Sequence, residues 1–260
     1  MEENLVLITF CFYLIAALIC LALLWYKKHT LEKLGILCTI IGFILLNIVL
    51  IYRSLLAGRL PGSNLYEFLL LFAWGMSATY LFIMIRYKLQ NSGVFILPLI
   101  IGVLGCAALF SSKIQPLMPA LQSPWLKFHV SVAMIGYSVF AVSFALALMS
   151  LLKVPVMLSH HKSLDDLIYG CNALGFSFLT LVIITGAIWA EQAWGTWWSW
   201  DPKETASLIT WLVYGFYLHL RHTSLWSSKA GAILSCLGFF AVLFTLMGIT
   251  LMVPGLHSYI

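Results

Sequence analysis

The chain has 260 residues, of which 62% are hydrophobic and 9% charged, and its mean hydropathy is +1.01. A soluble domain of this length could not carry that composition on its surface, so the sequence excludes a soluble globular protein and predicts a polytopic membrane protein. The net charge of +5 says little until it is sorted by membrane side, and we expect membrane lipid and no nucleic acid as partners.

Eight apolar segments follow one another along the chain, separated by charged residues or by Pro and Gly. A helix crosses the hydrocarbon layer in ~20 residues, with about 17 to 25 allowed. The predicted segments are 5–25, 34–52, 66–85, 94–110, 128–152, 169–190, 205–220 and 230–253. We therefore predict an all-α polytopic membrane protein with about eight transmembrane helices in a single membrane domain over residues 1–260, with halves at 1–127 and 128–260.

The first apolar segment is predicted to stay in the protein. It is too long for the core of a signal peptide, follows Glu2 and Glu3 rather than cations, and has no clear small-residue cleavage site. Residues 111–127, with three prolines, are predicted to form an irregular lid between the fourth and fifth segments. The six cysteines lie in apolar segments, and no two have metal-ligand or redox-pair spacing.

Lys and Arg divide unequally between the two sets of predicted loops, with nine on one side and five on the other. With the acidic residues included, the first side carries +6 and the second −1. Cationic loops remain on the cytoplasmic side, so the first set is predicted to be cytoplasmic. Eight spans then place both termini, the lid and the loop before the seventh segment on the outer side.

The most informative segment is 189–204, which reads WAEQAWGTWWSWDPKE. It contains half of the ten tryptophans of the chain: Trp189, Trp194, Trp197, Trp198 and Trp200. Tryptophan also marks ordinary membrane interfaces, where a belt supplies one or two aromatic residues at a helix end. Five tryptophans with a Gly and an Asp-Pro turn favour a built surface for a large, flat, partly apolar ligand.

The run from Asp201 to Glu204 predicts the start of a helix. Asp is a good N-cap, Pro suits the first helical position, and Glu in the first turn suits the helix dipole. Lys203 and the N–H groups of this helix start also make a candidate anion site beside the tryptophans. Arg53 and Arg59 in the outer loop are further candidates, although a surface cation is the commoner explanation for each.

Three histidines are candidate iron ligands. His129 begins the fifth segment and His257 follows the eighth, so both are predicted on the outer side near the depth of the tryptophans. Neutral imidazole is a strong iron ligand, and two histidines could hold haem iron from opposite faces. His219 lies late in the seventh segment, where an ionisable side chain at membrane depth is a functional candidate, and capping of the inner interface is the alternative.

The string WGTWWSWDPKETASLITWLVYGFYLHLR closely resembles the tryptophan-rich "WWD" signature of a superfamily of haem-handling proteins. LKFHVSVAMIGYSVF upstream and GLHSY near the end extend this resemblance. Within the superfamily the chain is similar to the CcsA/ResC-type cytochrome c biogenesis proteins of System II. The WDPKE continuation, the YLHLR histidine, GLHSY and eight spans distinguish it from the shorter CcmC-type haem-delivery proteins.

The resemblance implies that haem b binds at the loop of residues 189–204, with His129 and His257 as external iron ligands. It also implies that His219 serves a second, transmembrane haem site whose other ligand comes from a CcsB/ResB-type membrane subunit. The implied function is a cytochrome c synthase that moves haem outward and attaches it through thioethers to the Cys-x-x-Cys-His motif of apocytochrome c, with a thioredoxin-like protein as thiol reductant. No residue is a certain catalytic acid or base.

Two alternatives to this lyase stay open. One is a haem transporter or chaperone that passes haem to another carrier without forming bonds, and the other is a structural membrane subunit with an interfacial tryptophan belt. We expect a bacterial cytoplasmic membrane rather than a thylakoid membrane, because the chain is compact and lacks a transit-like leader.

Overall fold

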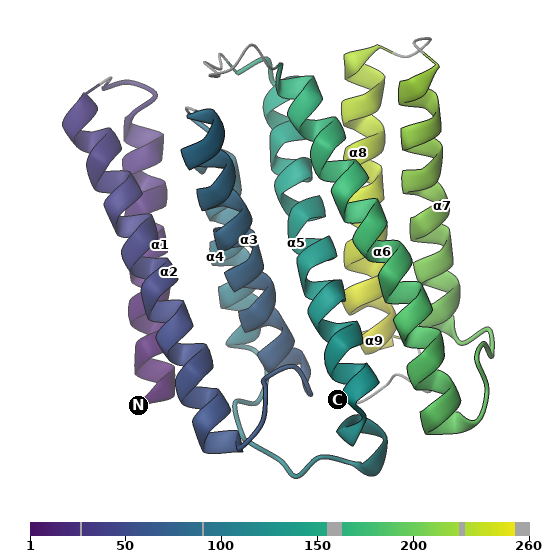
Figure 1. The fold of residues 1–260 in the computed structure, drawn as a ribbon. Coiled ribbons are helices and arrows are strands. Elements are labelled where there is room, and N and C mark those ends of the chain that lie inside the picture. The colour runs from purple at the N-terminus through teal and green to yellow at the C-terminus, as the bar shows by residue number, and fades with distance from the viewer. Residues whose placement is uncertain (27, 90, 155–162, 224–226, 253–260) are drawn as a thin grey trace. The chain divides into compact units, whose positions relative to one another are not determined.

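The structure is a computed structural model that describes residues 1–26, 28–89, 91–154, 163–223 and 227–252. Within these ranges the chain is helical and contains no strand (Figure 1). The helices are α1 Glu2–Ala22, α2 His29–Ala57, α3 Leu65–Tyr87, α4 Gly93–Ala107, η1 Pro119–Gln122, α5 Pro124–Leu151, α6 Leu164–Trp194, α7 Pro202–His222, α8 Ser228–Leu243, η2 Phe244–Gly248 and α9 Ile249–Met252. The predicted all-α class is confirmed.

Six helices of the described ranges are long and apolar enough to cross a membrane: α1, α2, α3, α5, α6 and the continuous run Ser228–Met252. Each of the eight predicted segments corresponds to one of the helices α1 to α8. The helix α4 is apolar but has 15 residues, and α7 opens with the polar run from Asp201 to Glu204. The chain is therefore a multi-span membrane protein.

The chain divides into two compact units, which we describe separately. Unit 1 comprises Met1–Ile114 and Leu152–Leu164, and unit 2 comprises Gln115–Leu151 and Asp165–Ile260. In unit 1, α1 packs against α2 and α4, and α3 packs against α2 and α4. Tyr13, fully buried, crosses from α1 to α3 and donates from its hydroxyl to Ser77 Oγ at 2.8 Å.

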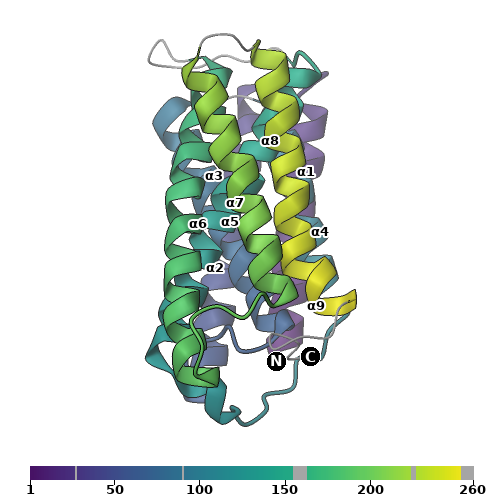
Figure 2. The ribbon, with the colours of Figure 1, turned by 90° about the vertical axis from the view of Figure 1, so that its right-hand side faces the viewer.

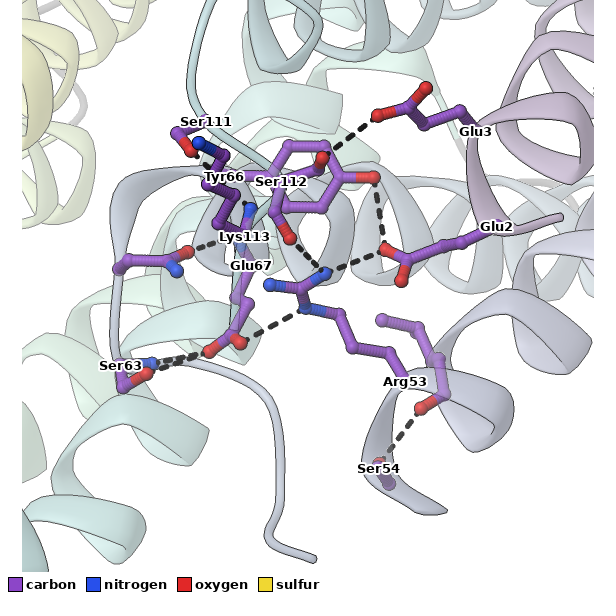
Figure 3. Close-up of polar contacts among 12 residues, drawn as sticks. Glu2, Glu3, Arg53, Ser54, Ser63, Tyr66, Glu67, Ser111, Ser112 and Lys113 are labelled. Atoms are coloured by element: carbon purple, nitrogen blue, oxygen red, sulfur yellow. Dashed lines mark hydrogen bonds and ion pairs between the residues drawn. The ribbon is translucent and has the colours of Figure 1, made fainter. Parts of the chain in front are cut away.

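One end of unit 1 is closed by a buried ion-pair network centred on Arg53 (Figure 3). Arg53 is completely buried, and its guanidinium donates to Glu67 at 3.0 Å, to Glu2 at 2.8 Å and to the carbonyl of Ser112 at 2.9 Å. Glu67 also accepts from Arg59 at 2.9 Å. The interpretation of Arg53 as a surface cation is therefore wrong. Carboxylates of α1 and α3 pair with the buried guanidinium and offset the cost of its desolvation.

In unit 2, α8 packs against both α5 and α7, and the last described turns, η2 and α9, pack against α7. The helix α6 contacts both α7 and α5. Trp211 of α7 donates to Thr180 Oγ1 of α6 at 2.9 Å, and Phe140 of α5 lies against Gly175 of α6. The start of α5, the end of α6, the start of α7 and α9 lie at one end of the unit (Figures 1 and 2). We call this the tryptophan end.

The helix ends differ from the predicted segment ends in ways that matter for the site. The helix α6 runs on to Trp194, four residues past Ala190, so Trp194 is helical like Trp189 and is not part of a loop. The helix α5 begins at Pro124, so the last four residues of the predicted lid are helical. The predicted eighth segment ends at Val253, which lies outside the described residues.

Candidate functional site

His129 lies in the second turn of α5 and is held from α6. Its Nδ1 is 3.0 Å from the carbonyl oxygen of Val182 and 3.4 Å from Thr185 Oγ1. A carbonyl can only accept, so Nδ1 carries the proton and Nε2 carries the lone pair. A histidine that ligates a metal commonly donates its other N–H to a carbonyl in this way, which fixes the ring and its tautomer. The orientation of His129 therefore fits an iron ligand.

Trp189 supports His129 from the side. The two rings stack with centroids 6.2 Å apart and an angle of 24° between their planes. Trp189 is 2% exposed, and its Nε1 donates to the carbonyl of Ala120 at 2.9 Å. It forms a small core with Leu121 and Leu126. Trp189 is thus part of the packed base of the site, and the irregular segment before α5 is pinned onto it.

Trp194 joins this base to the loop. Its ring meets Trp189 edge-on at 4.8 Å, and it is the last residue of α6. Gly195 then takes the left-handed conformation, with φ +75°, and its N–H donates to the carbonyl of Glu191 at 2.9 Å. This is the usual way in which glycine ends a helix.

The loop after Gly195 presents exposed indoles. Trp197 is 58% and Trp200 is 68% exposed, and Trp198 and Trp200 meet edge-on with centroids 5.8 Å apart. Trp200 has φ +58°, a left-handed conformation that is rare for a bulky residue and costs on the order of 1–3 kcal/mol. Such a conformation persists only where the surroundings impose it.

Asp201 and Glu204 form hydrogen bonds to the backbone of this turn. Asp201 Oδ1 accepts from the N–H of Lys203 at 2.9 Å, and Glu204 Oε2 accepts from the N–H of Asp201 at 3.2 Å. The predicted N-cap, the Pro at the helix start and the Glu in the first turn are confirmed as a capping box. Asp201 therefore occupies one N–H group of the predicted anion site.

Lys203 points to the last described turn of the chain. Its Nζ donates to Thr250 Oγ1 on α9 at 3.1 Å, while that hydroxyl donates to the carbonyl of Leu246 at 2.7 Å. A second contact of the same kind joins Thr210 and Thr245, whose hydroxyl oxygens are 3.1 Å apart. Thr245 lies in η2, a π-helical turn, and such turns are frequent at functional sites.

Of the remaining two candidate ligands, only His219 lies in the described part of the chain. His219 is exposed in the last turn of α7, at the opposite end of that helix from Lys203. It shares a helix face with Leu212 and Phe216, which are 55% and 54% exposed. His257 lies outside the described residues, five positions after Met252.

Several residues that shape the site could not be recognised from the sequence. Val182 supplies a backbone carbonyl, and Thr185 and Thr250 are ordinary residues of apolar helices. Gly186 leaves the room that the His129 ring fills, since a Cβ there would lie 2.9 Å from His129 Cε1. Among these residues, only Gly186 could have indicated close packing, because it is a small residue one helical turn before Trp189.

The helices define a polytopic membrane protein, with the tryptophans of residues 189–200 gathered at one end of unit 2. The sequence profile described as Cytochrome C assembly protein matches residues 62–257, a range that contains all the candidate ligands. The chain belongs to this family and is of the CcsA type, as its motifs predicted. It accordingly has a haem-handling role in cytochrome c maturation.

Similar proteins share most of the chain. "Cytochrome c biogenesis protein CcsA" of Trieres chinensis is 36% identical over 90% of this chain and 88% of its own length. The protein of the same name from Pyropia yezoensis is 34% identical over 100% and 97%, and that from Prochlorococcus marinus (strain MIT 9312) is 36% identical over 86% and 83%. Relatives come from plastids and cyanobacteria as well as bacteria.

A solved structure has the same fold. "Cytochrome c Heme Lyase CcmF" superposes with a TM-score of 0.74 at 16% identity, covering 95% of this chain and 46% of that one. The chain spans about half the length of that protein. At this identity the likeness concerns the fold alone.

Proposed function

We propose that this chain is the haem-presenting subunit of a membrane cytochrome c synthase. The site would lie at the tryptophan end of unit 2, with His129 and His257 as the axial iron ligands. The observation that carries this proposal is the bond from His129 Nδ1 to the Val182 carbonyl at 3.0 Å, together with the stacking on Trp189. These contacts fix the ring with the lone pair on Nε2, the form that binds iron.

The tryptophans would supply the apolar surface for the porphyrin. Trp197, Trp198 and Trp200 follow one another in the loop, while Trp189 and Trp194 form its packed base. Haem b carries propionates, and Asp201 and Lys203 complete the site at its polar edge. Lys203 has the charge that a propionate requires, and its position is fixed by Thr250.

Haem is the substrate that this chain would present to an apocytochrome. In thioether formation each thiol of the Cys-x-x-Cys-His motif adds across one vinyl group, so that sulfur bonds to one carbon and the proton goes to the other. The addition is balanced without an oxidant, although the two thiols must be reduced, which a thioredoxin-like protein would ensure. The contribution of this chain is positioning, which can supply a large part of a rate enhancement.

A CcsB/ResB-type membrane subunit would complete the complex. His219 is exposed on the same face of α7 as Leu212 and Phe216, so a ligand from another subunit could approach it there. That arrangement supports a transmembrane haem site shared between two chains. We place the complex in a bacterial cytoplasmic membrane, with the thylakoid membrane as the alternative.

The test is the absorption spectrum of the complex purified in detergent with its CcsB-type partner. We expect His129→Gly and His257→Gly each to lose the external haem, with recovery by added imidazole, while His219→Gly affects a separate signal. His29→Gly is the matched control, because His29 is an exposed histidine of unit 1 paired with Glu32. Full haem retention in both external variants would place the ligands elsewhere.

A second measurement separates the synthase from a haem carrier. Cells that express the complex and an apocytochrome are assayed for covalent haem on the cytochrome. Covalent haem that depends on His129 and His257 supports the synthase. Haem that is bound by the complex and appears only non-covalently on another carrier supports the chaperone.

A further inference from the structure

We infer that the Glu204 carboxylate is a positioning group, which holds Trp200 in its left-handed conformation and so presents the exposed indole to the porphyrin. The inference rests on the proposed haem site and adds to it a residue that touches neither the iron nor the tryptophan ring. The backbone of Trp200 has φ +58°, and this residue is 68% exposed.

The contacts of Glu204 span Trp200. Its Oε2 accepts from the N–H of Ser199 at 2.9 Å and from the N–H of Asp201 at 3.2 Å, the two residues that flank Trp200. Ser199 Oγ donates to the same oxygen at 3.3 Å. Successive N–H groups converge around a left-handed residue and form a concavity that binds anions. Here the anion is the carboxylate of the chain itself.

A capping box alone does not account for this pattern. Such a box requires only that Glu204 reach the N–H of the N-cap residue, Asp201. The bond to Ser199 lies on the other side of Trp200 and adds nothing to the helix start. From the far side, Thr205 Oγ1 donates to the carbonyl of Trp200 at 3.4 Å. The turn is thus fixed before, at and after the strained residue.

The direction of the indole provides the functional link. Packing does not explain the strain, because most of the Trp200 ring lies outside the protein core. Its edge-on contact with Trp198 means that a change in the backbone at residue 200 would also alter the aromatic surface that the two rings form. Strain that is held by hydrogen bonds and displays an exposed aromatic ring indicates a binding role.

The test uses the full chain with its partner, in detergent, with 5-fluorotryptophan incorporated and the Trp200 fluorine signal assigned by a Trp200→Phe variant. In the haem-free protein, Glu204→Ala is expected to shift the Trp200 signal and lower the unfolding midpoint by about 2–4 °C. Glu204→Gln retains an acceptor oxygen and should keep both near their original values. Glu191→Ala is the control, because Glu191 is a half-buried carboxylate at the end of α6.

A glycine at position 200 provides the decisive comparison. Glycine adopts the left-handed conformation without strain, so in a Trp200→Gly background the Glu204→Ala change should lower the midpoint less than it does alone. An equal drop in the unfolding midpoint in both backgrounds, or an unchanged Trp200 fluorine signal in Glu204→Ala, would overturn the inferred role of Glu204.

Haem absorbance distinguishes a failure of the inferred role of Glu204 from a failure of the proposed haem site. We expect a several-fold loss in Glu204→Ala, little loss in Glu204→Gln, and a several-fold loss in Trp200→Gly despite its relieved backbone. If Glu204→Ala moves the fluorine signal and leaves haem absorbance unchanged, the inferred presentation of Trp200 to haem is wrong. If His129→Gly also retains haem, the proposed site itself is wrong.

Discussion

Lys203 Nζ and Thr250 Oγ1 lie 3.1 Å apart and join the first turn of α7 to α9. Lys203 lies three positions after Trp200, and Thr250 lies seven positions before His257. The contact thus connects the segment that carries the aromatic surface to the end of the helix that leads to a candidate ligand. A bond between a charged donor and a hydroxyl contributes about 1.5–3 kcal/mol.

This contact predicts that Thr250 matters for haem binding although it carries no charge. Thr250→Val and Lys203→Met should each weaken haem retention by roughly tenfold, or about 1.4 kcal/mol. The double variant should be no worse than Lys203→Met, because Thr250 acts through its bond to Lys203. Haem titration of the detergent-purified complex measures this.

Thr39→Val is the matched control for Thr250→Val. Thr39 is a buried threonine of unit 1 whose hydroxyl donates to the carbonyl of Gly35 at 2.9 Å, the same local bond that Thr250 makes. If Thr250→Val keeps full haem affinity while Lys203→Met loses it, Lys203 acts on the propionate alone.

The charge of Lys203 predicts a dependence on pH. Lys203 precedes the apolar stretch of α7, and its burial lowers its pKa to about 8, against the opposing effect of Asp201. A lowered pKa means that the ammonium loses its proton as the pH rises through about 8. Haem affinity should therefore be highest below that pH and decline above it, because only the ammonium attracts a propionate.

Lys203→Arg is the variant that isolates this effect. Arginine remains charged throughout the accessible range, so this variant should bind haem with an affinity that does not change between pH 7 and about 9. The measurement is haem titration at a series of pH values. A decline of equal size in the wild type and in Lys203→Arg would assign the pH dependence to another group.

Gly186 offers a test of His129 that leaves the histidine in place. A Cβ at residue 186 would lie 2.9 Å from His129 Cε1 and 3.1 Å from Nδ1, closer than ordinary contact. Gly186→Ala should displace the ring from the Val182 carbonyl, reduce the external haem signal and allow partial recovery with imidazole. The absorption spectrum is the readout.

Gly170→Ala on the same helix is its control. A Cβ at residue 170 meets no heavy atom within 4 Å, so this change should leave haem binding intact and stabilise α6 by about 1 kcal/mol. Unaltered haem in both variants would mean that the fixed orientation of His129 is unnecessary for ligation.

The sequence allowed the helices and the approximate place of the site to be predicted, because long apolar runs and a cluster of indoles are signals of composition. The N-cap at Asp201 was also predictable, since the preference for such a cap is local. The support of His129 was not, because a backbone carbonyl of Val182 and the space at Gly186 depend on how α5 and α6 pack. The left-handed conformation of Trp200 was likewise unpredictable, because tryptophan has no intrinsic preference for a left-handed turn.

The burial of Arg53 could not be predicted from its place in an expected outer loop, because it depends on carboxylates of residues distant in the sequence. Glu2 is 51 positions before it and Glu67 is 14 after it. Arg53→Met removes the guanidinium and leaves the buried Glu67 and the partly buried Glu2 each with one partner fewer. The loss of one partner from a buried pair costs about 3–5 kcal/mol, and the bonds that Glu67 retains with Arg59, Gly62 and Ser63 favour the lower value.

The expected result is a clear drop in the unfolding midpoint of Arg53→Met with an unchanged haem signal per folded molecule, because these contacts belong to unit 1. Glu2→Gln added to Arg53→Met should restore part of the loss, since it removes the carboxylate that has lost the cation paired with it. Arg86→Met is the control, as Arg86 is exposed at the end of α3. Loss of haem from Arg53→Met at unchanged stability would instead make Arg53 an anion ligand, and the midpoint and the spectrum measured on one sample decide between the two.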